Sequence, residues 1–293
     1  PIPFLVFSTL KVQFKTISAS GVFFIISKIE YANPFSIKEK SADFSIINFN
    51  IGGITIEQVD GFDIITSDSK GNTQNIGKPQ LPTHTFNYSI DYDKDYMVNL
   101  EVTDYVVYEN INLLPTQNLR KVNADKVFIK DAKFYNSDSI YPEKKIESKR
   151  MSLRGYELLS VEITPYEYNP KEKKLKVFTN INIIISESGY REQNQRVPRS
   201  RSFELMYKKH IINSEDYHDS RSFQKPSILY VCGGNIADSE YLEELTTWRH
   251  KQGYVVNVVS SDDAGGSTTN IKNYILNAYN NWENPPEHVC FIG

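Results

Sequence analysis

A cysteine and a histidine, the pair that most often carries nucleophilic catalysis, lie close together near the end of the sequence. His288 and Cys290 are two positions apart in an apolar stretch, so in a strand their side chains would point the same way. A catalytic thiolate needs partial exposure and an electropositive setting, whereas this stretch predicts a strand buried on both faces. We therefore interpret Cys290, like Cys232, as a buried structural cysteine.

Two further groups of residues could hold a ligand where strands end. Gly233 and Gly234 lack the third glycine and the Lys-Ser/Thr pair of a phosphate-binding loop, and Asp238 would repel a phosphate. Asp262 and Asp263 form one carboxylate pair without further oxygen ligands, which is more typical of a solvated loop than of a cation site. The histidines show no metal-ligand spacing. The sequence thus predicts no metal site and no cofactor.

These residues belong to a pattern of alternating strands and helices over residues 227–293. Apolar strands are predicted at 227–232, 254–259 and 288–293, with amphipathic segments between them that end at Lys251 and near Trp282. The pattern predicts the first βαβαβ of a parallel α/β sheet, in which reactive groups lie beyond the carboxyl ends of the strands. Because the sequence stops with the third strand, we expect the catalytic groups to lie beyond residue 293.

The preceding region, residues 41–190, carries short strand patterns separated by turn signals such as Asn169-Pro170. No helical period longer than a few residues occurs there, so the region predicts an antiparallel β-sandwich. The predicted strands cover residues 43–49, 53–59, 62–66, 85–90, 97–108, 126–135, 156–168 and 175–186. The expected fold class is therefore α+β and multidomain, with a β-sandwich followed by a truncated parallel-sheet α/β domain.

Residues 191–226 differ from both neighbours, because basic side chains dominate them and prolines interrupt them. We interpret them as a basic connector in which residues 203–207 dock as a short helix. Residues 1–40 are interpreted as a leader. Its apolar run at 17–26 follows Lys11 and Lys15 and predicts an export signal, the alternatives being a hydrophobic strand or a mistranslated leader. The run is too short for a transmembrane span.

The composition is that of a globular protein, with 40% hydrophobic and 24% charged residues in 293. A net charge of −3 argues against nucleic-acid binding, which usually needs a basic face. Two cysteines provide no readable disulfide framework.

Four stretches, in this order, resemble the gingipain family of bacterial cysteine peptidases. The first two look like elements of the family's pro-domain, and the last two look like the start of its catalytic domain. They are Gly77-Lys-Pro-Gln-Leu-Pro82; Arg154-Gly-Tyr156 through Pro170 with Leu175–Phe178; Trp248–Val258; and Ile271–Trp282 with Val289–Gly293.

The resemblance implies a zymogen of a cysteine endopeptidase, secreted or at the bacterial cell surface, that acts on polypeptide substrates. Its pro-domain would contact and inhibit the catalytic domain within the same chain. The family's catalytic His and Cys lie at successive strand ends farther along, so we assign no catalytic residue and expect the fragment to be inactive.

Two regulatory positions follow from the resemblance. Arg120 or Lys121 is predicted to occupy the specificity pocket of the intact zymogen, the alternative being an exposed basic loop. Arg221 is predicted to be the site of maturation cleavage, in a connector of the kind that proteases cut. Two other functions remain open: a non-enzymatic surface protein that binds a partner through its β-sandwich, and a nucleotide-binding α/β domain.

Overall fold

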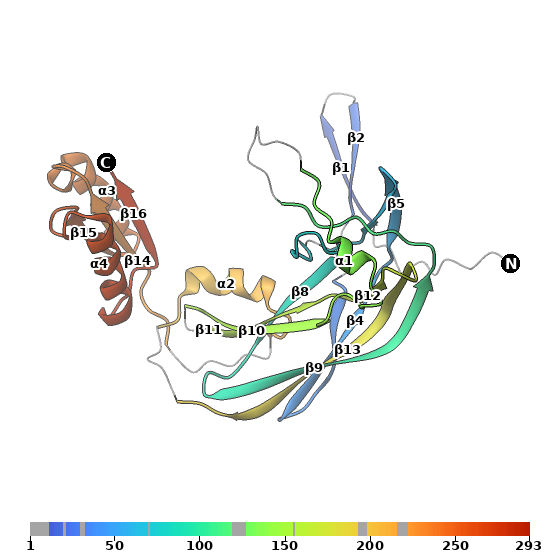
Figure 1. Ribbon diagram of the computed structural model, residues 1–293. Coiled ribbons are helices and arrows are strands. Elements are labelled where there is room, and N and C mark those ends of the chain that lie inside the picture. The colour runs from blue at the N-terminus through green and yellow to red at the C-terminus, as the bar shows by residue number, and fades with distance from the viewer. Residues whose placement is uncertain are drawn as a thin grey trace. The chain divides into compact units, whose positions relative to one another are not determined.

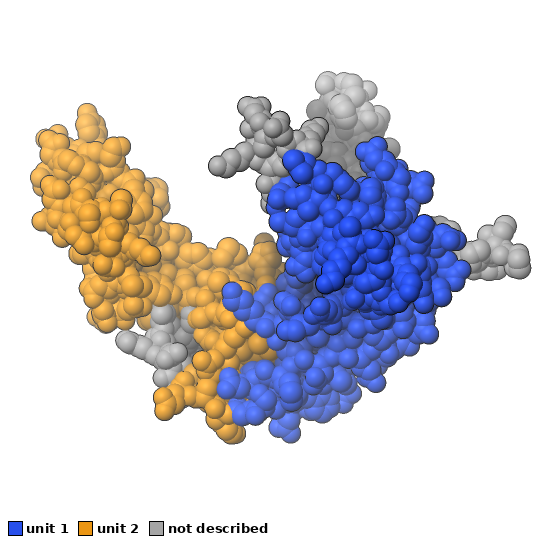
Figure 2. All heavy atoms as spheres, in the orientation of Figure 1, with its two compact units in different colours: residues 1–86, 95–149, 160–189 blue, residues 87–94, 150–159, 190–293 orange. Residues whose placement is uncertain are grey.

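The computed structural model describes residues 12–19, 22–29, 33–69, 71–118, 127–154, 156–192, 198–215 and 222–293. The chain forms two compact units, which are coloured separately in Figure 2. Unit 1 comprises residues 1–86, 95–149 and 160–189, and unit 2 comprises residues 87–94, 150–159 and 190–293. Arg120, Lys121 and Arg221, the three positions that the sequence singles out for regulation, lie outside the described residues.

Unit 1 is rich in antiparallel strands (Figure 1). A five-stranded sheet has the order β12-β13-β4-β3, with β9 also paired to β13, and a four-stranded sheet has the order β10-β11-β8-β7. β1 pairs with β2, and β5 pairs with β6. The bounds are β1 Val12–Ala19, β2 Val22–Ile29, β3 Phe35–Lys40, β4 Phe44–Asn50, β5 Thr55–Val59, β6 Phe62–Thr66, β7 Gly71–Asn72, β8 Pro82–Ser89, β9 Lys94–Tyr108, β10 Ile146–Leu153, β11 Tyr156–Ile163, β12 Tyr166–Asn169 and β13 Lys174–Tyr190.

The two central strands of the five-stranded sheet show why this sequence forms strands. Along β4, buried and half-buried residues alternate, and Ile47 and Phe49 are fully buried. In the register of the sheet Ile47 pairs with Ile183, and Phe49 pairs with Ile181. Because successive side chains of a strand point to opposite faces, this period places the large apolar residues on one face, where they form the core.

Two of the predicted strands are wrong. Residues 126–135 were expected to be one strand, but α1 (Ala132–Tyr135) forms there after Asp131, whose carboxylate accepts a hydrogen bond from the Phe134 backbone N–H at 2.9 Å. Residues 156–168 form two strands, because Pro165 carries no backbone N–H for the ladder. The sequence reasoning also missed β3 and β10. Of the apolar run at 17–26, residues 17–19 lie in β1 and residues 22–26 in β2, and residues 20 and 21 lie outside the described residues.

Unit 2 contains the turn of the β10–β11 hairpin, helix α2 and a three-stranded parallel sheet. α2 (Arg201–His210) packs on the hairpin through a cluster of apolar side chains. This helix includes the predicted residues 203–207. The cluster consists of Tyr156, Leu158, Tyr207 and Ile211, with Phe203 packed against it.

The parallel sheet has the order β15-β14-β16, and both neighbours of β14 run parallel to it. The residues that face α3 alternate along β14 with those that face α4, so the two helices cover opposite faces. The elements are β14 Ser227–Cys232, the 3₁₀ turn η1 Ile236–Asp238, α3 Glu240–Lys251, β15 Val255–Ser260, α4 Thr268–Asn281 and β16 His288–Ile292.

The burial of β16 differs from the sequence expectation. Among the described residues β16 pairs with β14 and has no strand on its other side, so it forms an edge of the sheet. His288, Cys290 and Phe291 are exposed, and the prediction that Cys290 is buried is therefore wrong. Cys232 is buried in the central strand, as expected.

Candidate functional site

In a parallel α/β sheet, reactive groups are expected beyond the carboxyl ends of the strands. There the Gly233 backbone N–H donates to Ile292 O at 2.7 Å, which ties the ends of β14 and β16 together. Gly234 has a φ of 55°, so this turn needs a residue that tolerates the left-handed region.

Asp262 and Asp263, at the same edge, belong to a hydrogen-bonded turn. The Ser260 hydroxyl donates to the Asp263 carboxylate at 2.7 Å, and the Asp263 backbone N–H donates to Ser260 Oγ at 3.0 Å. Within the part of the chain that the structure describes, no group of three or more His, Cys, Asp or Glu side chains is placed to hold a metal ion. These contacts give the Asp263 carboxylate a role in the local structure.

The thiols and His288 do not form a nucleophile–base pair in the described contacts. The His288 ring packs against Phe203 with 5.4 Å between ring centroids. Burial raises the pKa of the Cys232 thiol, with a smaller contribution from Cys290, so Cys232 is held as the neutral thiol. The structure thus offers chemistry-bearing side chains at this sheet but no assembled catalytic site among the residues described.

A more elaborate arrangement lies in unit 1, around residues 113–118 and 127–131. We call it the loop base, because these two segments flank residues 119–126, which include Arg120 and Lys121. Gln117 joins the segments: its side-chain amide donates to Ile129 O at 2.7 Å, and its carbonyl oxygen accepts from the Ile129 backbone N–H at 2.9 Å. The amide also donates to Pro115 O at 2.9 Å. Gln117 thereby makes the pair of hydrogen bonds that a neighbouring strand would make.

The loop base rests on the Gly77–Pro82 stretch. Gly77 donates from its backbone N–H to Thr116 O at 2.8 Å and accepts from the Asp131 backbone N–H at 3.0 Å, so it contacts both flanking segments. Its φ is 79°, and a Cβ at this position would lie 3.2 Å from Asp131 N. Both facts favour glycine here.

Asp131 fixes the second segment electrostatically as well as by capping α1. Lys78 Nζ lies 2.8 Å from the Asp131 carboxylate. The hydrogen bond from Lys78, followed by that from the Phe134 backbone N–H, lowers the pKa of Asp131 below its usual value. The sequence reasoning missed Gln117 and Asp131. The Asp131-Ala-Lys-Phe pattern of a capping residue before a helix could have revealed the second of these, whereas no local signal marks Gln117.

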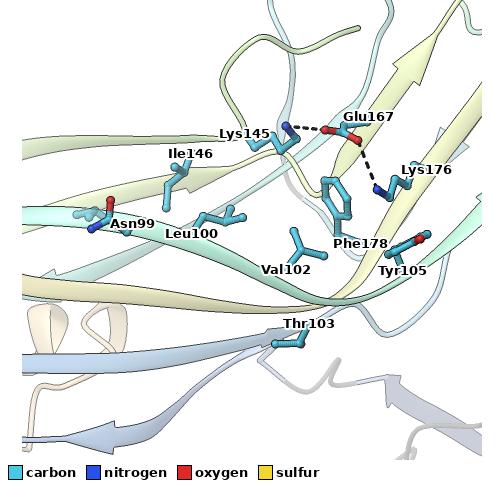
Figure 3. A pocket seen from close by; sticks show the side chains of 11 residues that line it. Asn99, Leu100, Val102, Thr103, Tyr105, Lys145, Ile146, Glu167, Lys176 and Phe178 are labelled. Carbon is cyan, nitrogen blue, oxygen red and sulfur yellow. Dashed lines mark ion pairs between the residues drawn. The ribbon is translucent and has the colours of Figure 1, made fainter.

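Unit 1 also contains an open groove beside β9, with a volume of about 590 Å³ (Figure 3). Glu167 lies between two lysines: Lys145 Nζ is 2.6 Å from one carboxylate oxygen, and Lys176 Nζ is 3.8 Å from the other. Lys176 also lies over the Tyr105 ring, 4.0 Å from its centroid. Val98, Leu100 and Val102 of β9, with Ile146 and Phe178, give the groove its apolar lining, and Asn99 and Thr103 add polar groups. No cysteine or histidine is among its described lining residues.

Comparisons with known proteins agree with the division of the chain. Residues 36–227 match the Propeptide_C25 family, and residues 221–293 match Peptidase family C25. Gingipain R2 of Porphyromonas gingivalis is 24% identical over 231 residues, which cover 76% of this chain and 31% of that protein. Lys-gingipain of the same organism is 25% identical over 262 residues, covering 84% of this chain and 15% of that protein. The chain therefore spans less than a third of the length of these curated relatives.

A solved structure shows the same fold. The complex of the RgpB pro- and mature domains from Porphyromonas gingivalis aligns with a TM-score of 0.55 and 18% identity, covering 64% of this chain and 100% of that one. This likeness concerns the fold alone, whereas the propeptide match covers more than half of the sequence. The chain therefore belongs to the gingipain-like C25 family, with a propeptide region followed by a peptidase region.

Proposed function

We propose that the chain is the N-terminal part of the zymogen of a secreted cysteine endopeptidase. The main support is the order of the two family matches: the propeptide match ends, and the peptidase match begins, within residues 221–227, directly where β14 starts. In this proposal the leader ends before β3 (Phe35–Lys40), not at residue 40 as expected, because β3 pairs with β4 in the sheet. The pro-domain then extends to residue 190, residues 191–226 are a connector and 227–293 are the start of the catalytic domain. The catalytic His and Cys lie beyond residue 293, and the substrates are polypeptides.

The pro-domain in this proposal inhibits the catalytic domain through Arg120 or Lys121, which enters the specificity pocket. The loop base supports this role. Gln117, Gly77 and Asp131 hold together the two segments that flank residues 119–126. Holding the flanks of a binding segment in place lowers the entropic cost of binding, which suits an inhibitory element.

Maturation in this proposal follows cleavage after Arg221. Two described parts of the connector pair with each other: the Gln224 backbone N–H donates to Arg199 O at 2.9 Å, and residues 199 and 223 form a β-bridge. Basic connectors of this kind are where proteases cut.

The test is incubation of the full-length parent precursor with its mature enzyme, followed by N-terminal sequencing of the products. We expect a new N-terminus at Ser222 and none there in Arg221→Ala. The control Lys225→Ala changes a nearby basic residue on the other side of the cleavage site and should be processed like the wild type. Cleavage only at other positions would remove Arg221 from the mechanism, and a parent without thiol-dependent peptidase activity would overturn the function itself.

A further inference from the structure

One arginine in unit 2 joins three segments that are far apart in the sequence. Arg154 lies at the turn of the β10–β11 hairpin with a φ of 47°, a left-handed conformation that is uncommon for a residue other than glycine. Its Nη1 donates to Pro286 O at 3.0 Å, and its Nη2 donates to Gln224 Oε1 at 3.3 Å. A strained backbone that aims a side chain at two acceptors is a reason to look for a specific role.

Two aromatic rings complete the surroundings of this guanidinium. Its Cζ lies 5.3 Å from the centroid of Phe203 on α2 and 5.6 Å from the centroid of Tyr279 on α4. Arginine suits such a place, because its planar group donates in a fork and stacks on aromatic faces at the same time. We call Arg154, Phe203, Gln224, Tyr279 and Pro286 the Arg154 latch.

Neighbouring contacts strengthen the same junction. Gln224 Nε2 donates to Pro285 O at 2.9 Å, so this side chain accepts from Arg154 and donates to the residue before Pro286. On α2, the Ser202 hydroxyl donates at 2.9 Å to the carboxylate of Glu287, which is 8% exposed. The hairpin turn, α2 and the end of the connector therefore all contact residues 285–288.

The position of the latch on the sheet matters for function. Residues 285–288 lead into β16, so the latch lies at the amino end of the parallel strands. Reactive and ligand-binding groups of such sheets lie at the carboxyl end, where Gly233 and Ile292 meet. The latch thus contacts the amino end of the sheet, opposite the end at which reactive groups are expected.

We propose that Arg154 is the central contact of an interaction surface that binds the propeptide's last hairpin and α2 to the amino end of the peptidase strands. The assignment of the two parts to propeptide and peptidase rests on the proposed function. The surface is separate from the loop base, and it contains Gln224, which lies after Arg221. Cutting the connector at Arg221 therefore leaves every latch contact in place, and these contacts are expected to keep the two pieces together.

The test uses the 293-residue chain with the recognition sequence of a site-specific protease inserted between Asp219 and Ser220. After complete cutting, the dissociation constant of the two pieces is measured by size-exclusion chromatography over a dilution series. We expect the wild-type pieces to stay together at micromolar concentration. Arg154→Gly removes the side chain while suiting the positive φ, and should raise the dissociation constant at least tenfold, because two hydrogen bonds from a charged group are lost.

Lys173→Gly is the matched control, because Lys173 is also basic and also has a positive φ, 51°, but lies in the turn between β12 and β13. It should leave the dissociation constant unchanged. Arg154→Lys keeps the charge without the fork and should weaken binding to an intermediate degree, which provides a second variant if the first fails to fold. Separation of the wild-type pieces at micromolar concentration, or equal affinity of wild type and Arg154 variants, would overturn the proposal. Neither outcome depends on peptidase activity or on cleavage at Arg221, so failure of the proposed function is seen separately.

Discussion

Gln117 offers the most direct test of the loop base. Gln117→Ala removes three hydrogen bonds, two to Ile129 and one to Pro115 O, from a half-buried position. A neutral hydrogen bond contributes about 1 kcal/mol net, and because water replaces part of what is lost here, we expect local opening of the loop base to become easier by about 2 kcal/mol. At about 1.4 kcal/mol per factor of ten, this corresponds to roughly 30-fold faster exchange of the Asp131 amide hydrogen, which is bonded to Gly77 O.

The assay is native-state hydrogen exchange followed at the Asp131 amide by NMR, because its acceptor, Gly77 O, is kept in the variant. Gln117→Glu turns both donations into contacts of a carboxylate oxygen with the carbonyl oxygens of Pro115 and Ile129, so its exchange should be at least as fast as that of Gln117→Ala. Gln74→Ala is the control, since Gln74 Nε2 makes an exposed hydrogen bond to Asn72 O at 2.7 Å outside the loop base. An unchanged Asp131 exchange rate in Gln117→Ala would show that Gln117 does not hold the two segments together.

Two further predictions concern titration and thiol reactivity. Burial lowers the pKa of His84 below 6.5 in the folded chain. As the pH drops, the unfolded chain therefore takes up a proton at His84 before the folded chain does. The free energy of unfolding should fall as the pH drops through 6.5 toward the folded pKa. Urea unfolding at about pH 7.5 and 5.5 should show this loss of stability in the wild type and in the control His210→Gln, which changes an exposed histidine. The loss should be smaller in His84→Gln. An equal loss in His84→Gln would contradict the assignment to His84. A thiol titration of the native 293-residue chain should detect one fast-reacting group, Cys290, and Cys232 only after unfolding. Fast reaction that persists in Cys290→Ser would show that β14 does not shield Cys232.

The sequence predicted residues 227–293 well, because the signals there are local. Apolar runs with turns between them locate β14, β15 and β16, and Gly253 adopts the positive φ, 87°, that its place after α3 implies. The segment 126–135 failed for the opposite reason. Val127, Phe128 and Ile129 look like a strand, but Ile129 is held by Gln117, and Asp131 starts a helix.

Most contacts of the candidate sites could not be predicted from the sequence. Arg154 meets Pro286, 132 positions later, and no spacing rule connects the two. Cys290 is exposed because β16 is an edge among the described residues, and strand order is a property of the whole sheet. Arg120, Lys121 and Arg221 remain predictions.

The pairing of β4 with β13 has a consequence for synthesis. Phe44 pairs with Ser186 and Asn50 with Asn180, so the central ladder of unit 1 joins segments from opposite ends of that unit. Such distant pairing is slow, since a long loop must close before any contact is gained. A chain that emerges from its amino end cannot complete this sheet until residue 186 is available, and the parallel strands begin only about forty residues later. The proposed pro-domain therefore completes its folding shortly before the proposed catalytic region begins to emerge, and the length of the connector sets the delay between the two.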